Sequence, residues 1–61
     1  MIYIDIIEIY FLKNNVKIEY YNSNIKIDEY TTNSMVVLKR KMLEWYDCPN
    51  WCRNLAIYYS R

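Results

Sequence analysis

The chain contains no glycine among its 61 residues, so every turn and every left-handed backbone position must be formed by another residue. Asparagine is the residue that takes a left-handed conformation most readily after glycine. Two asparagine-containing segments, Lys13–Asn15 and Asn22–Asn24, each separate two apolar stretches. We therefore predict tight turns that join consecutive strands at these two segments.

The residues that the chain lacks also exclude most kinds of catalytic site. Histidine, the usual proton shuttle near neutral pH, is absent, and the lack of glycine excludes a Gly-rich phosphate loop. The carboxylates do not form a catalytic pair. Asp28 and Glu29 are sequential and therefore point to opposite faces of a strand, whereas Glu44 and Asp47 are expected to form solvated salt bridges with basic residues on the exposed helix side. We expect no catalytic residue, no cofactor and no enzymatic activity.

A long first strand is expected within residues 1–12, because isoleucines alternate there with other residues and β-branched side chains favour strands. The alternation slips by one residue at Ile6–Ile7, which predicts a β-bulge or a strong local twist. The same isoleucines also fit one face of a helix, which is the competing interpretation.

Two further strands are expected before residue 31. The alternation in the second strand assigns one face to Val16, Ile18 and Tyr20 and the other face to Lys17, Glu19 and Tyr21. Such a pattern is typical of an antiparallel sheet with one solvated face. Ile25 and Ile27 continue the pattern, so residues 1–30 predict a three-stranded antiparallel β-meander.

An amphipathic helix is expected next, with an N-cap residue within Thr31–Ser34. Pro49 should end this helix near Asp47, because proline lacks a backbone donor and restricts the residue before it. The apolar stripe that should pack on one face of the sheet consists of Met35, Leu38, Met42 and Trp45.

Residues 50–61 fit two interpretations. Trp51, Leu55 and Tyr58 share a helical face, whereas Ile57–Tyr59 suits an edge strand, and we favour a short second helix. The predicted fold is a single small α+β domain over residues 1–61. It comprises a three-stranded antiparallel β-meander, an amphipathic helix packed on one face, and a short C-terminal helix or strand.

Cys48 and Cys52 have C-x3-C spacing, which differs from the C-x2-C spacing of zinc knuckles and redox sites, and no histidine completes a tetrahedral site. We expect two reduced thiols that pack as small hydrophobes, and no metal site. The alternatives are a disulfide and half of a zinc site shared across a dimer.

Tyrosine is the strongest functional signal, because eight tyrosines in so short a chain cannot all lie in the core. Tyrosine and tryptophan anchor protein interfaces at a small entropic cost. The predicted partner interface consists of Tyr3, Tyr10, Tyr21, Tyr58 and Tyr59, and the first three should form an aromatic stripe on the outer face of the sheet. Cross-strand pairing that only stabilises the sheet is an equally weighted alternative.

A second candidate surface is basic. Its residues, Lys39, Arg40, Lys41 and Arg53, resemble the phosphate-binding charges of nucleic-acid-binding proteins. Consecutive helical residues point in different directions, however, and the net charge of +1 is far below that of a committed nucleic-acid binder. A solvated helix face is therefore the favoured interpretation.

Hydrophobic residues make up 54% of the chain, more than one small core can bury, so we expect a homodimer or an obligate complex. A monomer with partly exposed tyrosines is the alternative. No stretch approaches the roughly 20 apolar residues that span a bilayer. No membrane association and no targeting segment are expected, and the default compartment is the cytoplasm, of a host cell if the gene is viral.

Isoleucine, asparagine, lysine and tyrosine account for 29 of the 61 residues, which indicates an AT-rich gene. This composition is typical of small proteins of phages, viruses or mobile elements. We expect a non-enzymatic interaction protein that inhibits or retunes a larger host machine, such as a nuclease-based antiviral defence complex or a polymerase. The alternatives are a small nucleic-acid-binding regulator that uses the basic helix face and a self-assembling structural subunit.

Overall fold

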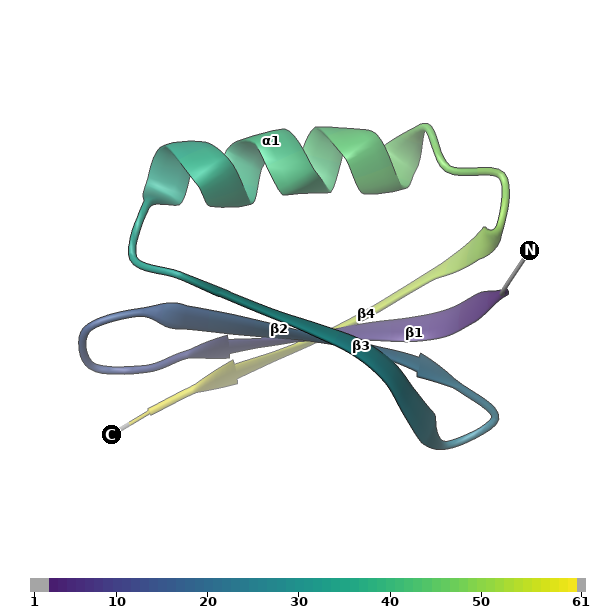
Figure 1. Cartoon of the computed structure of the whole chain (residues 1–61), viewed down its shortest axis with the longest axis horizontal. Helices are drawn as coiled ribbons and strands as arrows, with labels where there is room; N and C mark the ends of the chain where they lie inside the picture. The colour runs from purple at the N-terminus through teal and green to yellow at the C-terminus, as the bar shows by residue number, and fades with distance from the viewer. Residues whose placement is uncertain (1–2, 61) are drawn as a thin grey trace.

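The structure, a computed structural model, describes residues 3–60 except for the side chain of Cys52. One helix lies across one face of a four-stranded sheet (Figure 1). In chain order the elements are β1 (Ile4–Phe11), β2 (Val16–Asn22), β3 (Ile25–Thr32), α1 (Met35–Tyr46) and β4 (Trp51–Tyr59). The order across the sheet is β3-β2-β1-β4, so β3 and β4 are the edge strands.

The predicted antiparallel meander is confirmed. β1 pairs with β2 in a continuous antiparallel register that includes Ile7 opposite Tyr20 and Ile9 opposite Ile18. β2 pairs with β3 in the same antiparallel sense. The α+β class is therefore as predicted, although a fourth strand makes the sheet mixed.

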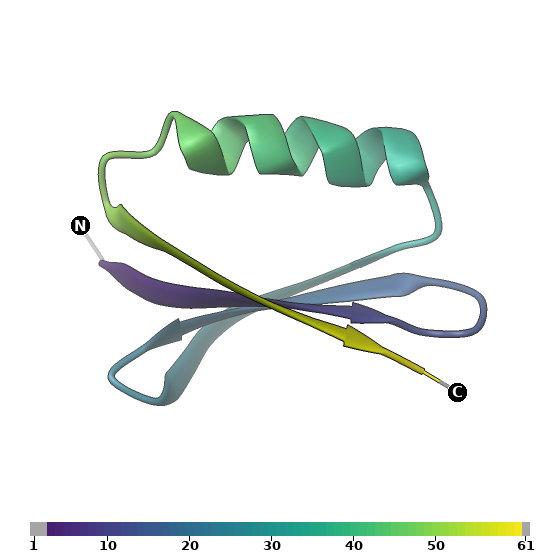
Figure 2. The ribbon, with the colours of Figure 1, turned by 180° about the vertical axis from the view of Figure 1, so that it is seen from behind.

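The C-terminal segment is a strand, so the second helix that we favoured is wrong. β4 runs parallel to β1, with Ile7 opposite Leu55 and Ile9 opposite Ile57. α1 carries the chain from β3 at one edge of the sheet to β4 at the other, as the two opposite views show (Figures 1 and 2). Pairing with β4 satisfies the backbone groups of β1 that a helix at this position would leave open.

The two hairpin turns differ in their use of left-handed residues. Ser23 (φ 51°) and Asn24 (φ 67°) join the paired residues Asn22 and Ile25, which is the arrangement of a two-residue type I′ turn. Within residues 3–60 the only other positive φ belongs to Arg53, so Lys13–Asn15 turns without one. The positions of both turns are as predicted, but only the second turn needs left-handed residues.

The sheet contains two irregularities in register. Between β1 and β4, the pairing shifts between Ile4 and Ile6, whose partners are Trp51 and Asn54. The register is continuous at Ile6–Ile7, so the break predicted there is wrong in position. The observed shift lies just before Ile6, and its extra residue belongs to β4. The second shift lies between β2 and β3 and leaves Ile27 as the additional residue.

The core lies between the sheet and the helix. Its buried apolar side chains are Ile7, Ile9, Val16, Ile18, Tyr20, Leu38, Trp45 and Trp51. Leu38 and Trp45 confirm the predicted helix stripe, and Met42 packs partly against the core. Met35 is exposed, contrary to the prediction, because it lies in the first turn of α1 at the end of the stripe.

The ends of α1 follow the predicted signals. Ser34 is the N-cap, and its hydroxyl accepts a hydrogen bond from the backbone N–H of Val37 at 3.3 Å. Asp47 is the C-cap residue, two positions before Pro49. No helix in the described part of the chain has the length and apolarity needed to cross a bilayer.

Candidate interaction surface

The sheet face opposite the helix, here called the open face, carries a network of tyrosine, glutamate and lysine side chains. The hydroxyl of Tyr10 donates a hydrogen bond to Glu8 Oε1 at 2.6 Å, and the hydroxyl of Tyr21 donates to Glu19 Oε1 at 2.7 Å. Each pair lies two residues apart on one strand, so both members point to the same face. Tyr10 and Tyr21 therefore lie on the solvated face, as the alternation predicted.

Glu19 is buried on this open face, with only 7% of its surface exposed. Besides the Tyr21 hydroxyl, its carboxylate has Lys26 Nζ at 3.5 Å and Lys17 Nζ at 3.7 Å from Oε2. The hydrogen bond from Tyr21, followed by the attraction of Lys17 and Lys26, lowers the pKa of Glu19. The same hydrogen bond raises the pKa of Tyr21 to about 12.

The burial of Glu19 is a feature that alternation alone does not predict. Glu19 lies directly opposite Glu8 on one side and Glu29 on the other. Like charges in this arrangement repel, unless cations and hydroxyl donors compensate for them. Lys26 provides compensation, because its Nζ also lies 2.8 Å from Glu29 Oε1. The sequence signal for such a network is a glutamate on each of β1, β2 and β3 with a lysine or tyrosine two or three residues away.

Acidification is expected to destabilise the protein through Glu19. A carboxyl group whose pKa is lower in the folded state contributes stability above its unfolded-state pKa, about 4.3 for glutamate. This contribution is lost as the pH falls through the lower, folded-state pKa. Urea midpoints measured from pH 7 to pH 3 should therefore fall more steeply for the native protein than for Glu19→Gln.

Glu44→Gln is the matched control for this experiment, because Glu44 lies on the exposed side of α1. This variant should retain the pH dependence of the native protein. An unchanged pH dependence in Glu19→Gln would show that Glu19 does not stabilise the folded state through its charge.

The ring of Tyr10 is also held in the sheet. It stacks on the ring of Tyr58 with centroids 4.8 Å apart, and Lys17 Nζ lies 5.1 Å from its centroid. The hydrogen bond to Glu8 raises the pKa of Tyr10 above its usual range. These contacts support the alternative in which Tyr10 and Tyr21 stabilise the sheet.

The five predicted interface tyrosines do not form one compact patch. Tyr3 precedes β1, whereas Tyr10 lies near the other end of that strand, about 20 Å away at the usual rise per residue. Tyr58 stacks on Tyr10, but Tyr59 stacks on Phe11, with centroids 5.2 Å apart. Tyr58 and Tyr59 are adjacent strand residues and therefore point to opposite faces of β4.

Most of the exposed large apolar side chains instead belong to α1 and β4. We call this region the β4–α1 surface, and it consists of Met35, Val36, Leu43 and Tyr46 on the helix and Ile57 and Tyr59 on the strand. Tyr58 is exposed as well, but it points to the open face, where it stacks on Tyr10. On the helix, Met42, Leu43, Tyr46 and Lys39 line a shallow groove of about 310 Å³. This groove was not predicted, because Leu43 and Tyr46 lie outside the stripe that packs on the sheet.

Two ring contacts show how the helix is oriented about its own axis. Lys41 Nζ lies 4.5 Å from the ring centroid of Tyr30 on β3. On the other flank, the ring of Tyr46 contacts that of Trp51 on β4, with centroids 5.7 Å apart. The flank of α1 that carries Leu43 and Tyr46 is thus turned towards β4, the strand nearest the viewer in Figure 2.

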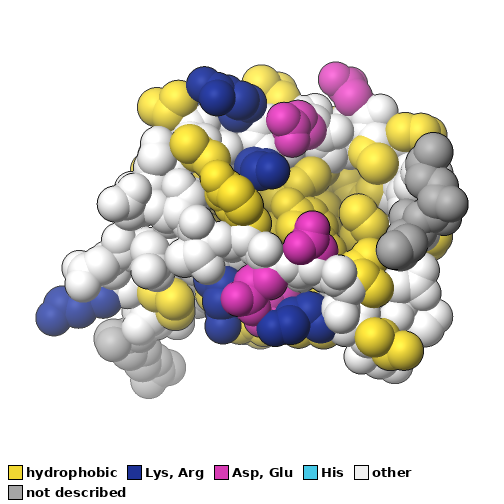
Figure 3. Space-filling model, viewed as in Figure 1, with side chains coloured by type: hydrophobic (Ala, Val, Ile, Leu, Met, Phe, Trp, Pro, Cys, Tyr) yellow, Lys and Arg dark blue, Asp and Glu magenta, His cyan; other side chains and the backbone are white. Residues whose placement is uncertain are grey.

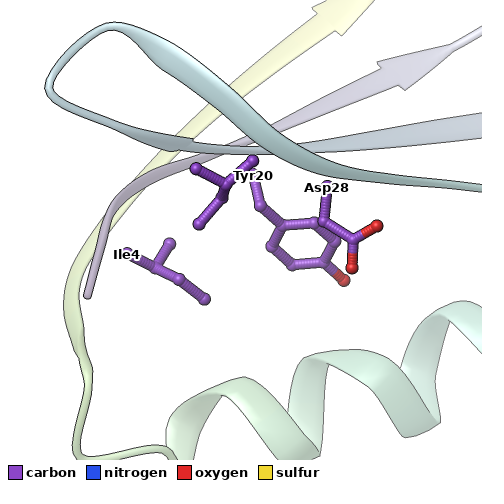
Figure 4. A pocket seen from close by; sticks show the side chains of 4 residues that line it. Ile4, Tyr20 and Asp28 are labelled. Atoms are coloured by element: carbon purple, nitrogen blue, oxygen red, sulfur yellow. The ribbon is translucent and has the colours of Figure 1, made fainter. Parts of the chain in front are cut away.

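The β3 side of the molecule differs in character. Figure 3, drawn from that side, shows acidic and basic side chains around an apolar hollow between helix and sheet. Ile4, Tyr20, Ile27 and Asp28 line a cavity of about 240 Å³ there. Ile4 and Tyr20 point from the sheet towards the helix (Figure 4). The cavity is smaller than the roughly 300–1,000 Å³ of typical small-molecule sites.

The basic residues predicted to contact nucleic acid are not brought together on one face. Lys39 lines the groove on the β4 side, whereas Lys41 lies over Tyr30 on the β3 side. Arg53 donates hydrogen bonds to the carbonyl oxygens of Tyr46 at 2.8 Å and Trp51 at 3.4 Å. Arg53 thus binds a carbonyl at the C-terminal end of α1, a favourable position for a cation.

Comparison with known protein families, curated proteins and solved structures finds no match for this chain. Its function is therefore inferred from the surfaces described above.

The cysteine side chains are described only in part. Cys48 has a free thiol and packs, partly buried, against the core. The side chain of Cys52 lies outside the described residues, so the redox state of the pair stays a prediction. Among the described residues, no three histidine, cysteine, aspartate or glutamate side chains are grouped to hold a metal ion.

Proposed function

We propose that this protein is a non-enzymatic protein-binding module that binds its partner through the β4–α1 surface. The observation that carries the proposal is the concentration of exposed apolar side chains there, with Leu43 69% and Tyr59 74% exposed. Monomeric soluble proteins rarely expose a contiguous apolar patch larger than a few hundred Å². A partner that covers these side chains removes this unfavourable contact with water.

The position of β4 supports the same proposal. β4 is an edge strand that pairs on one side with β1. Such an edge presents backbone donors and acceptors to which another strand can be added. The open face is a weaker candidate, because the hydroxyls of Tyr10 and Tyr21 already bind Glu8 and Glu19.

In this proposal, binding inhibits or retunes a larger host protein, and a phage, virus or mobile element supplies the gene. The support for this setting is compositional and comes from the abundance of isoleucine, asparagine, lysine and tyrosine. The support for binding itself is structural and does not depend on the source of the gene.

The test is a pull-down with tagged native chain from extracts of the source cell, followed by calorimetry with the purified captured protein. Leu43→Asp should weaken binding at least about tenfold, because it places a charge in an apolar interface. Ile25→Asp is the matched control, since Ile25 is 67% exposed but lies on β3. Equal binding by both variants, or no specific partner for the native chain, would contradict the proposal.

A further inference from the structure

The outer edge of β4 has unpaired backbone groups at defined positions. The backbone N–H of Ser60 donates to the carbonyl of Phe11 at 2.9 Å, and Phe11 pairs with Tyr59. Backbone groups alternate in direction along a strand, so the even-numbered residues of this part of β4 face β1. The N–H and C=O groups of Leu55, Ile57 and Tyr59 consequently point away from the sheet.

The two edges of the sheet differ in their protection against strand addition. β3 carries Lys26, Asp28 and Glu29, and its pairing is interrupted at Ile27. Charges and bulges of this kind discourage pairing with another chain. β4 contains neither charge nor proline from Asn54 to Tyr59, and its register shift lies before that stretch.

We infer that β4 pairs antiparallel with β4 of a second copy of this chain, about a twofold axis at Ile57. In this register each Leu55 lies opposite the partner's Tyr59, and all three outward-pointing residues of each strand are paired. Each Tyr58 ring lies opposite the partner's Ala56, so a large side chain meets a small one. The inference rests on the proposed function, because it uses the same β4–α1 surface. The second copy occupies this surface in the isolated protein, and a host protein that binds there competes with it.

The apolar area available is close to what a stable dimer needs. At about 100 Å² of exposed side chain each, the six residues of the β4–α1 surface offer roughly 600 Å² per copy, or about 1,200 Å² for two copies, which is the lower end of the range for specific interfaces. The twofold axis places both helices on the same side of the joined sheet, with their apolar flanks turned towards the β4 pair. The net charge of only +1 per chain keeps repulsion between copies small.

The same asymmetry between edges predicts a closed dimer. Once β4 is paired, both free edges of the joined sheet are β3 strands, which carry the charges and the interruption at Ile27. A twofold contact uses the same patch on both subunits and closes after two copies. The self-assembling structural subunit that the sequence analysis kept as an alternative is therefore not expected.

The test uses analytical ultracentrifugation of the native chain and of Ile57→Pro over a range of micromolar concentrations. Proline removes the outward-pointing N–H of residue 57 but none of the hydrogen bonds to β1, and edge strands tolerate proline at such positions. The native chain should sediment at twice the chain mass. Ile57→Pro should keep the native circular dichroism spectrum and dissociate at concentrations at least about tenfold higher.

A second variant keeps the test decisive if Ile57→Pro does not fold. Residues on the twofold axis form a hydrogen-bonded pair with Cα atoms about 5.5 Å apart, within the range that a disulfide spans. Ile57→Cys should therefore form a covalent dimer on oxidation, whereas the native chain and Ile25→Cys should not.

The possible outcomes separate this inference from the proposed function. A monomeric native chain whose binding to another protein is weakened by Leu43→Asp would overturn the inference and leave the proposed function standing. A monomer that binds no protein would overturn both. A dimer that persists in folded Ile57→Pro, with no cross-link through Ile57→Cys, would place the dimer contact elsewhere and overturn the inference alone.

Discussion

Leu38→Asp is expected to unfold the protein. Leu38 is 2% exposed and belongs to the core cluster between α1 and the sheet. An unpaired carboxylate at this position costs several kcal/mol, about 3–5, whereas a domain of this length is stabilised by only about 3–9 kcal/mol. Circular dichroism during thermal and urea unfolding should show no cooperative transition.

Leu43→Asp is the matched control for Leu38→Asp, because it introduces the same side chain into the same helix. Leu43 is exposed, so this variant should show a cooperative melt and a native spectrum. A native melting curve for Leu38→Asp would contradict the packing of α1 described here. Loss of folding in both variants would point to helix propensity as the cause.

Trp45→Ala is expected to produce a loss of similar size. The buried Trp45 ring contacts the rings of Tyr20 and Trp51, with centroids 5.9 Å and 6.3 Å away. Removing a buried aromatic side chain typically costs about 3–5 kcal/mol, which approaches the whole stability of a small domain. Urea unfolding at 25 °C should place much of the variant in the unfolded state without denaturant.

Two companion variants divide this effect into its parts. Tyr20→Phe removes only the hydroxyl that accepts the hydrogen bond from Trp45 Nε1 at 3.1 Å, and should cost about 1–3 kcal/mol. Tyr46→Ala removes an exposed ring from the same end of the helix and should cost about 1 kcal/mol. A Trp45→Ala loss no larger than that of Tyr46→Ala would show that Trp45 is not central to the core.

Local patterns were sufficient to predict most of the fold. The alternation of apolar and polar residues in β2 arises because one face of the strand, with Ile18, packs against the core and the other is the open face. The N-cap at Ser34 and the end of α1 before Pro49 depend on residues within one turn of each helix end. Each of these features depends on residues that are close together in the sequence.

β4 could not be predicted with the same certainty, because its structure depends on a strand more than forty residues away in sequence. Trp51, Leu55 and Tyr58 fit a helical face equally well, and no local signal separates the two interpretations. The parallel partner β1 decides between them, since it leaves backbone groups that only a neighbouring strand can satisfy.

The candidate surface was predicted only in part. Of the five tyrosines in the predicted interface, Tyr59 lies on the β4–α1 surface, whereas Tyr58 stacks on Tyr10 on the open face. The hydroxyls of Tyr10 and Tyr21 donate hydrogen bonds to Glu8 and Glu19. The exposed apolar residues of α1 were not predicted, because their position beside β4 could be seen only when the orientation of α1 over the sheet was known. The abundance of tyrosine predicted a partner interface, which stays a prediction, and only the fold shows which of these rings are exposed.

The position of β1 inside the sheet has a consequence for folding during synthesis on the ribosome. β1, β2 and β3 emerge first and can form their hairpins at once, whereas the side of β1 that pairs with β4 stays bare until Tyr59 has left the exit tunnel. During that interval neighbouring nascent chains on one polysome expose the same apolar strand. Until β4 has emerged, β1 is therefore an edge strand that is open to pairing with another chain.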